Sequence, residues 1–217
     1  MLKHLILPAL ALTLSLATHA QTKIGLALDY EHIQAPALQN LGSGSGMGGS
    51  VFFYAPLKHN LGLDVSFDLA GGHTTYQFYP FSPDPAWVPT LVSEKRSFFY
   101  TAIPVHLVYS HTFRQLRLFA GAGVALASVG MSVQSFHGFE MGGTCTTFSG
   151  SFTAGLELFQ HVMLSGEFRP FNTVLNKTDR YQYTPYKVDN LLSVKLGYVL
   201  GTIHATKHSA GKKHPNT

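Results

Sequence analysis

The chain has few charges, one cysteine, and no long apolar run after its first segment. Only 12% of its residues are charged, about half the fraction found in ordinary soluble domains, so part of its surface should meet something other than water. The single cysteine, Cys145, cannot form an internal disulfide, which excludes a small disulfide-stapled secreted domain. No uncharged apolar run after residue 20 is long enough for a transmembrane helix. A closed β-barrel is the remaining structure that can cross a bilayer.

The first segment has the features of a secretory signal peptide. A basic start precedes an apolar run from Leu5 to Leu16, and small residues at Thr18 and Ala20 suit a signal peptidase cut before Gln21. The apolar run is too short to span a bilayer as a helix. We therefore expect three parts, namely a signal peptide at residues 1–20, an outer-membrane β-barrel at residues 21–203 and a basic, flexible periplasmic tail at residues 204–217.

Alternation of apolar and polar residues is the strongest pattern in the mature chain. From Leu61 to Ala70, five large apolar residues occupy every second position and oppose glycine, alanine, serine and aspartate, which is typical of a strand with two different faces. The same alternation recurs at 23–31, 148–158, 162–169 and 192–200. The segments 48–56, 97–111 and 117–133 are apolar or small on both faces, but their β-branched and aromatic residues favour strands. The sequence thus predicts an all-β fold of eight strands.

The connections between these strands alternate between long and short. Short turns are expected at 57–60, 112–116 and 160–161, and long loops at 34–46, 77–93, 134–145 and 171–189. In outer-membrane barrels the periplasmic turns are short and the extracellular loops are long. The pattern predicts an antiparallel up-and-down transmembrane barrel in the bacterial outer membrane, with both termini in the periplasm and the four long loops outside.

Two short motifs resemble a known family. The stretch Phe99-Tyr100-Thr101-Ala102-Ile103-Pro104-Val105-His106-Leu107, followed by Leu118-Phe119-Ala120-Gly121-Ala122-Gly123, is similar to the outer-membrane β-barrel domain family common in Bacteroidetes, which includes the gliding and secretion protein PorT. Those proteins carry a strand with an Ile-Pro step and then a strand with a Gly-x-Gly step. A weaker likeness reaches the closing stretch Val194-Lys195-Leu196-Gly197-Tyr198. The resemblance implies the same eight-stranded barrel and the same location.

Charged residues gather on the face of the strands that a membrane barrel turns inward. An eight-stranded barrel has an interior just wide enough for its own side chains, and buried charges are costly unless they pair. We therefore predict a salt-bridged, plugged lumen, although conduction of protons or ions through the network stays an alternative. The predicted luminal charge network consists of Lys23, Asp29, Glu31, Asp64, Asp68, Glu157, Glu167, Arg169 and Lys195, with Arg117 added if its face is assigned correctly.

Aromatic residues concentrate near the predicted strand ends and suggest interfacial girdles. The expected girdles contain Tyr30, Tyr76, Phe78, Tyr79, Phe98, Phe99, Tyr100, Phe136 and Phe148 on the outer side and Tyr54, Tyr109, Phe113, Phe159 and Tyr198 on the periplasmic side. Trp87 lies in the middle of a proline-rich loop, where an exposed aromatic either packs on the barrel rim or meets a partner. It is the loop residue that we single out as an interaction candidate.

Several function classes receive little support. There is no Gly-x-Ser-x-Gly motif, and no catalytic residue or cofactor is predicted. The histidines are scattered without ligand spacing, so no metal is predicted. Part of the +4 net charge lies in the signal peptide and tail, so no nucleic-acid partner is predicted. Outer-membrane lipid is the expected partner, with a further protein or ligand at the loops. The alternatives are a lipid-modifying barrel enzyme, a narrow solute or ion channel, and a soluble lipocalin-like carrier, which the polar inner face disfavours.

Overall fold

The computed structural model describes residues 22–34, 41–78, 92–136, 139–174, 176–177 and 187–203. Among these residues there is no helix long and apolar enough to cross a membrane. The predicted signal peptide and the predicted tail lie outside the described residues. The strands are β1 (Thr22–Gln34), β2 (Leu41–Pro56), β3 (Leu61–Phe78), β4 (Val92–Phe113), β5 (Leu116–Phe136), β6 (Phe139–Leu158), β7 (Val162–Val174), β8 (Asn176–Lys177) and β9 (Lys187–Ile203).

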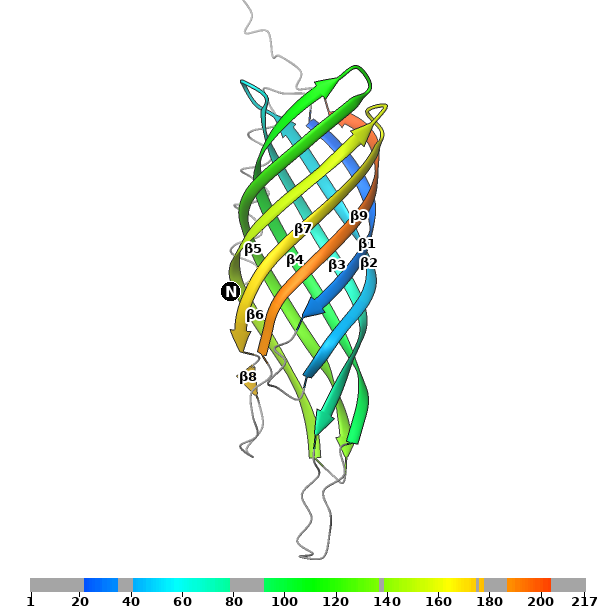
Figure 1. Ribbon diagram of the computed structural model, residues 1–217, viewed down its shortest axis with the longest axis vertical. Helices are drawn as coiled ribbons and strands as arrows, with labels where there is room; N and C mark the ends of the chain where they lie inside the picture. Colours follow the sequence, from blue (N-terminus) through cyan, green and yellow to red (C-terminus); the bar gives the residue numbers. More distant parts are fainter. Residues whose placement is uncertain are drawn as a thin grey trace, which may run out of the picture.

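Eight of the strands close into a ring (Figure 1). Hydrogen-bonded neighbours follow the order β5, β4, β3, β2, β1, β9, β7, β6, and β6 then pairs with β5. Each of these pairings is antiparallel, and the two-residue β8 pairs with β6 at Gly143 and Thr144. Thr22 pairs with Ile203, so the first and last strands meet at one rim of the barrel. The predicted closed, antiparallel, eight-stranded barrel is confirmed.

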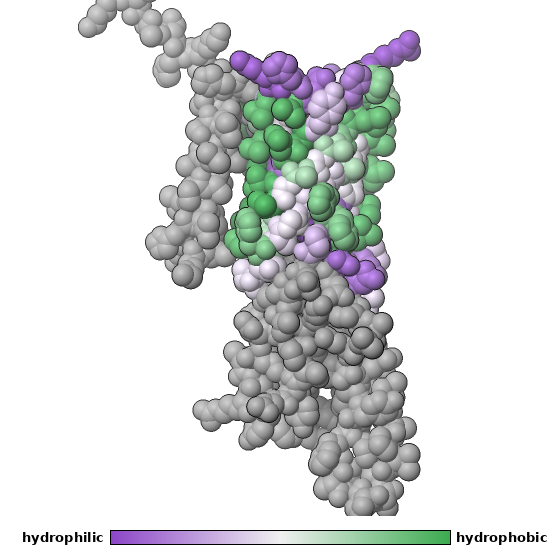
Figure 2. All heavy atoms as spheres, turned by 60° about the vertical axis from the view of Figure 1, so that its left-hand side comes forward, coloured by the Kyte–Doolittle hydropathy of each residue, from purple (hydrophilic) through white to green (hydrophobic). Residues whose placement is uncertain are grey.

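The two faces of the wall differ as the alternation predicts. From Leu191 to Leu200 in β9, buried and exposed residues alternate without exception, and the buried positions include Ser193 and Lys195. Large hydrophobic side chains point outward and form a band on the face seen in Figure 2, next to hydrophilic residues at the rim of short turns. We call this band the apolar belt. Its exposed members include Leu26, Leu28, Phe67, Leu69, Leu107, Val124, Phe152, Leu164, Val194 and Leu196.

Two of the four predicted long loops are wrong over much of their length. β2 begins at Leu41, and Gly44 pairs with both Ile33 and Thr74, inside the predicted loop 34–46. β5 and β6 continue until Phe136 pairs with Phe139, so most of 134–145 is strand. Both segments are rich in glycine, which has no side chain to reveal its face, and the period of two is therefore invisible in the sequence. The other two loops also shorten, because β4 begins at 92, β7 ends at 174 and β9 begins at 187.

The three connections at the rim of Thr22 and Ile203 are short, as predicted. The turn between β4 and β5 is tighter than expected, since only 114–115 separate the strands. Between β6 and β7, the His161 N–H donates to the Leu158 carbonyl at 3.0 Å, and both central residues have positive φ, 53° at Phe159 and 64° at Gln160. This is the geometry of a type I′ turn, which matches the twist of a hairpin. The turn therefore lies one residue earlier than predicted.

The ladder between β6 and β7 is interrupted in the half of the barrel away from the short turns. The two strands pair from Leu158 and Val162 as far as Phe152 and Phe168, and within the described chain the pairing resumes only at Gly143 and Thr144 with β8. β7 continues instead along β9, with a register shift between Pro170 and Thr173. Proline has no N–H to donate, and a bulge locally disrupts a ladder. We call this interruption, 145–151 of β6 facing 169–174 of β7, the β6–β7 seam.

The β6–β7 seam should be a weak point of the wall. We expect the amides of 145–151 to exchange with solvent at least tenfold faster than those of 123–129 in β5, which pair with the same stretch of β6 and also with β4. The reason is that opening the edge of β6 breaks one ladder, whereas opening β5 breaks two. Hydrogen–deuterium exchange with peptide-level mass spectrometry measures both segments in one sample. Equal protection of the two peptides would show that the seam is closed in solution.

Candidate functional site: the charged lumen

The predicted luminal charges all lie on the inner face of the wall. Asp29, Glu31, Asp68, Glu157, Glu167, Arg169 and Lys195 are buried, while Lys23 and Asp64 are half-buried and line a small internal cavity with Arg117. Sequence alternation placed these side chains, because each belongs to the polar face of its strand. It did not show which of them contact one another, since the contacts cross the barrel.

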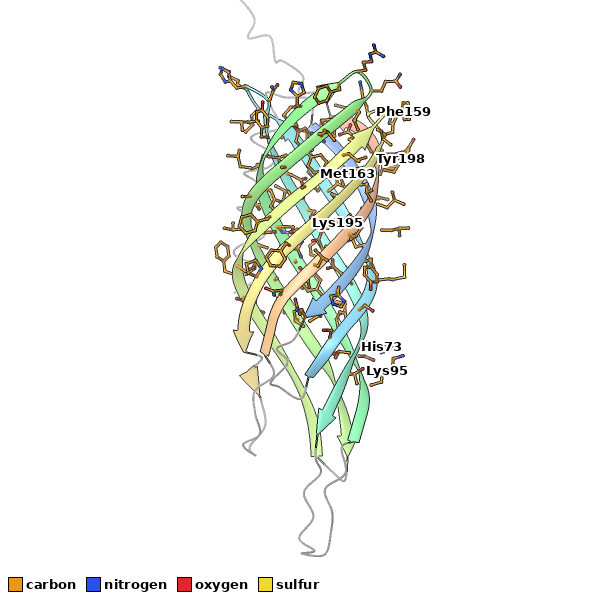
Figure 3. The ribbon with its side chains drawn as sticks, viewed as in Figure 1. His73, Lys95, Phe159, Met163, Lys195 and Tyr198 are labelled. Atoms are coloured by element: carbon orange, nitrogen blue, oxygen red, sulfur yellow. The ribbon has the colours of Figure 1, made fainter. Side chains whose placement is uncertain are left out.

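Four of these residues form a compact cluster halfway along the barrel, which we call the central network. Arg169 Nη2 lies 2.6 Å from Asp68 Oδ2 and 2.5 Å from Glu167 Oε2. Lys195 Nζ lies 2.8 Å from Asp68 Oδ1 and 3.1 Å from Glu167 Oε2. Two cations thus share two carboxylates, and the charges of the cluster cancel. Figure 3 shows Lys195 between the short-turn rim, marked by Phe159, and the opposite end, marked by His73 and Lys95.

The central network connects opposite walls of the barrel. Asp68 belongs to β3 and Arg169 to β7, and four steps separate these strands in the ring of eight, so they face each other across the lumen. Both side chains are fully buried, at 0% exposure. Ion pairs withdrawn from water in this way are held by strong, charge-assisted hydrogen bonds. The network therefore fixes the cross-section of the barrel and occupies it.

A second ionic group closes the lumen nearer the short-turn rim. Glu157 accepts hydrogen bonds from Lys23 Nζ and from Arg117 Nε, the latter at 2.8 Å. The Arg117 guanidinium also lies over the Tyr54 ring, 4.1 Å from its centroid, a cation–π contact. The inward face assigned to Arg117 in the sequence is therefore correct. This group draws together β1, β2, β5 and β6.

The sequence did not predict the apolar plug that surrounds this second group. Phe52, Val108, Phe119, Met163, Val199 and Ala27 form one buried cluster inside the barrel. Glycines make room for the rings, since a Cβ at Gly25 would lie 2.2 Å from the Phe52 ring and one at Gly62 would lie 2.4 Å from Tyr54. The remaining cavity is about 10 Å³, which is the order of a single water site. Phe52 and Phe119 come from segments that are apolar on both faces, so no alternation could have assigned them inward.

Three aromatic residues predicted for the girdles are instead luminal. Tyr54, Phe98 and Tyr100 are buried, at 8%, 3% and 0% exposure. Their positions near strand ends suggested the membrane interface, but each occupies an inward-facing position in the alternation of its strand. The Tyr100 ring centroid lies 5.5 Å from the Arg169 guanidinium carbon. The residues that do face outward are Tyr30, Phe99 and Phe148 of the predicted outer girdle and Tyr109, Phe113, Phe159 and Tyr198 of the predicted periplasmic girdle.

Asp29 and Glu31 differ from the other buried acids. Neither has an ion-pair partner among the described residues, although Ser50 Oγ donates to Asp29 Oδ1 at 3.1 Å. They lie on β1 beside the central network, since Asp29 pairs with Lys195 in the register of β1 and β9.

A serine, a histidine and a carboxylate do meet inside the barrel, but not as a catalytic relay. His106 Nε2 lies 2.8 Å from Ser151 Oγ, and Ser151 Oγ donates to Glu167 Oε1 at 2.5 Å. Because the serine proton goes to the glutamate, His106 donates to the serine and does not accept its proton. A relay needs the carboxylate on the far nitrogen of the imidazole. All three residues are buried, so the arrangement fits a structural hydrogen-bond chain.

Three other features considered in the sequence lie outside the luminal charge network. Trp87 and the loop around it lie outside the described residues. Among the described residues, no group of three or more His, Cys, Asp or Glu side chains could hold a metal ion. Pro104, from the Ile-Pro step of the family resemblance, points inward in β4, where the pairing with β3 is interrupted between Val105 and Ala102.

Comparisons with known proteins complete the description. No protein-family model and no curated protein matches the chain, so the resemblance to the Bacteroidetes family stays a prediction. Neisserial surface protein A is a similar solved structure, with 13% identity, a TM-score of 0.48, and 82% of this chain and 94% of that chain covered. The Yersinia pestis attachment invasion locus protein Ail, solved with the heparin analogue sucrose octasulfate, has 11% identity, a TM-score of 0.46, and coverage of 83% and 97%. The outer membrane protein OprG of Pseudomonas aeruginosa has 10% identity, a TM-score of 0.46, and coverage of 87% and 99%. The assignment of the barrel rests on the strand pairing of this chain itself.

Proposed function

We propose that the protein is an outer-membrane β-barrel whose lumen is sealed by its own side chains and whose activity lies in the extracellular loops. One observation carries the proposal, namely that the closed wall is apolar outside and ionic inside. A water-soluble barrel places its apolar residues within, whereas this barrel exposes Leu28 at 66%, Leu196 at 54% and Phe67 at 49%. Hydrocarbon is the solvent that suits such a surface.

The sealed lumen favours a structural or interaction role over transport. The central network occupies the middle of the lumen. The Glu157 group, with the apolar plug around it, occupies the lumen nearer the short-turn rim, where the cavity that they line measures about 10 Å³. A solute would have to displace neutralised, buried ion pairs in order to pass. Ser151, which meets a histidine and a carboxylate, is buried. The exposed Ser97 Oγ lies 3.3 Å from His73 Nδ1 on the outer wall, but no carboxylate among the described residues completes this pair, so an enzymatic role is less favoured. The loops, including that of Trp87, are left as the surface where a protein or other ligand would bind.

The topology orients the barrel within this proposal. The start of the first strand, the end of the last strand and all three short turns lie at one rim of the barrel. Short turns lie on the periplasmic side of outer-membrane barrels. We therefore place both termini in the periplasm. β3, β4, β5 and β6 extend beyond the other strands at the opposite end (Figure 1) and would carry their hairpins away from the cell surface.

Cell fractionation tests the proposal directly. The mature protein should sediment with the outer membrane, resist extraction by alkaline carbonate and migrate differently on SDS gels before and after boiling, because a closed barrel keeps its structure in cold SDS. A known periplasmic protein from the same cells is the soluble control. Recovery of the protein in the periplasmic fraction, with one mobility at all temperatures, would contradict the proposal.

A further inference from the structure

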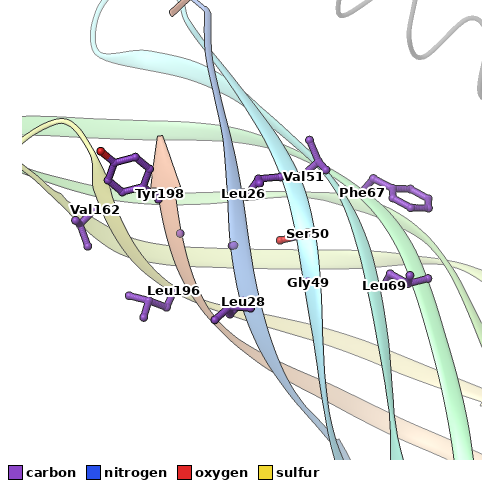
Figure 4. A pocket seen from close by; sticks show the side chains of 12 residues that line it. Leu26, Leu28, Gly49, Ser50, Val51, Phe67, Leu69, Val162, Leu196 and Tyr198 are labelled. Carbon is purple, nitrogen blue, oxygen red and sulfur yellow. The ribbon is translucent and has the colours of Figure 1, made fainter. Parts of the chain in front are cut away.

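The outer wall of the barrel has a hollow over a glycine. The hollow has a volume of about 700 Å³, and its residues come from β3, β2, β1, β9 and β7. Figure 4 shows the side chains of Leu28 and Leu69 on either side of Gly49. We call the hollow the Gly49 groove. Its remaining walls include Val51, Phe67 and Leu196.

Strand register explains why the groove lies at this place. Gly49 occupies an outward position of β2 and pairs with Leu28 of β1 and with Leu69 of β3. A row of leucines is thus interrupted by a residue without a side chain. A Cβ at Gly49 would come within 4 Å of one atom alone, the Ala27 carbonyl oxygen at 3.2 Å. The fold therefore tolerates a side chain here with a small adjustment, and close packing of the wall does not require the glycine.

One end of the groove differs from the rest. Tyr198 lines the groove, and its ring stacks on that of His161 with centroids 5.8 Å apart and an interplanar angle of 18°. Both side chains are exposed near the short-turn rim. A phenol hydroxyl and an imidazole can each donate a hydrogen bond to an anionic oxygen. The groove is therefore apolar along its length and has hydrogen-bond donors at its periplasmic end.

We propose that the Gly49 groove binds a glycerophospholipid of the periplasmic leaflet, with one acyl chain over Gly49 and the phosphate beside Tyr198 and His161. The inference rests on the proposed membrane location. The volume of the groove falls within the range of about 300–1,000 Å³ that small-molecule sites occupy. No charged residue lines the groove, which suits an acyl chain. The single polar end selects an amphiphile in one orientation, and its position at the short-turn rim selects the periplasmic leaflet.

Lipid retention during purification tests this site. The mature barrel is extracted from outer membranes in a mild detergent, and phospholipids bound per barrel are counted by native mass spectrometry. We expect one phospholipid on the natural protein and at least a tenfold smaller bound fraction for Gly49→Leu, whose side chain occupies the groove. His161→Ala should lower the bound fraction several-fold, because the phosphate loses a donor. Gly49→Ala, which adds one methyl group, should give a smaller loss of bound phospholipid. It replaces Gly49→Leu in the test if the leucine variant does not assemble.

Gly150→Leu is the matched control. Gly150 is also an exposed strand glycine, on β6, and a Cβ built there meets nothing within 4 Å, so this variant should retain the phospholipid. Heat-modifiable migration in the outer-membrane fraction verifies that each variant is folded. Equal retention by folded Gly49→Leu and natural protein would overturn the inference and leave the membrane location intact. Barrel dimers that disappear in Gly49→Leu would also overturn it, in favour of a second copy in the groove. A protein found outside the membrane would overturn both proposals.

Discussion

Replacement of Arg169 by methionine should destabilise the barrel by about 3 kcal/mol, because it leaves buried carboxylates short of a cation. Removing one partner of a buried ion pair typically costs about 3–5 kcal/mol. We expect the lower end of this range, since Lys195 keeps its contacts with Asp68 and Glu167 at 2.8 and 3.1 Å. The free energy of unfolding, measured by urea titration of the barrel in lipid vesicles, reports the change.

Comparison with a second variant separates the ion pair from the loss of packing. In Asp68→Asn the other partner is removed, and the double variant with Arg169→Met should cost clearly less than the sum of the two single changes, because residues in one network couple. Lys58→Ala is the control, as Lys58 is an exposed lysine in the β2–β3 turn, and it should change the stability by less than about 0.5 kcal/mol. An Arg169→Met barrel as stable as the Lys58→Ala barrel would show that the network contributes nothing to stability.

The strands that alternate in sequence were the ones predicted most accurately. β3 and β9 place a large apolar residue at every second position over 61–69 and 192–200, β7 does so over 162–168 apart from Gly166, and the structure turns those residues outward. Their polar positions supplied most of the luminal charges, including Asp68, Glu167, Arg169 and Lys195. For these strands the period of two is sufficient for the assignment, because the outer face is apolar and the inner face packs against the polar side chains of the lumen.

The same reasoning failed for segments without alternation. β2 begins in a glycine-rich stretch, and β4 and β5 are apolar on both faces, so sequence alone could not choose their inward residues. Phe52 and Phe119 fill the lumen, whereas Phe53 and Leu118 in the same strands face outward. The choice follows from register, which depends on hydrogen bonds to neighbouring strands. Register also decides that glycines at 25 and 62 lie against the rings of Phe52 and Tyr54.

The pairing of the luminal charges could not be predicted from the sequence for a related reason. Asp68 and Arg169 are 101 residues apart and meet because a tilted ring of eight strands brings β3 opposite β7. Which charges share a level in the lumen depends on the stagger of every strand between them. A list of inward-facing residues can therefore be read from the alternation, but the contacts that neutralise them require the closed structure. Asp29 and Glu31 illustrate the limit, since their inward faces were predicted, whereas the absence of an ion-pair partner for either among the described residues was not.

Replacement of Leu196 by arginine should destabilise the folded barrel in a bilayer by about 2–4 kcal/mol, the cost of an arginine near the midplane on the lipid-facing side of a barrel. Leu196 belongs to the apolar belt, is 54% exposed and follows Lys195, which lies midway along the barrel (Figure 3). Urea titration in lipid vesicles measures the loss.

The size of this change, compared with that of a matched substitution outside the belt, distinguishes a lipid-facing surface from a water-facing one. Leu57, in the β2–β3 turn, is 42% exposed, nearly as much as Leu196, so Leu57→Arg is a matched substitution outside the belt and should cost about 0–1 kcal/mol. In a water-soluble barrel both leucines would be surface residues, and both substitutions would stay within about 0.5 kcal/mol. A large difference between the two variants therefore requires a low-dielectric solvent around Leu196. Equal and small effects would mean that water wets the belt, and the inward charges would then need another explanation.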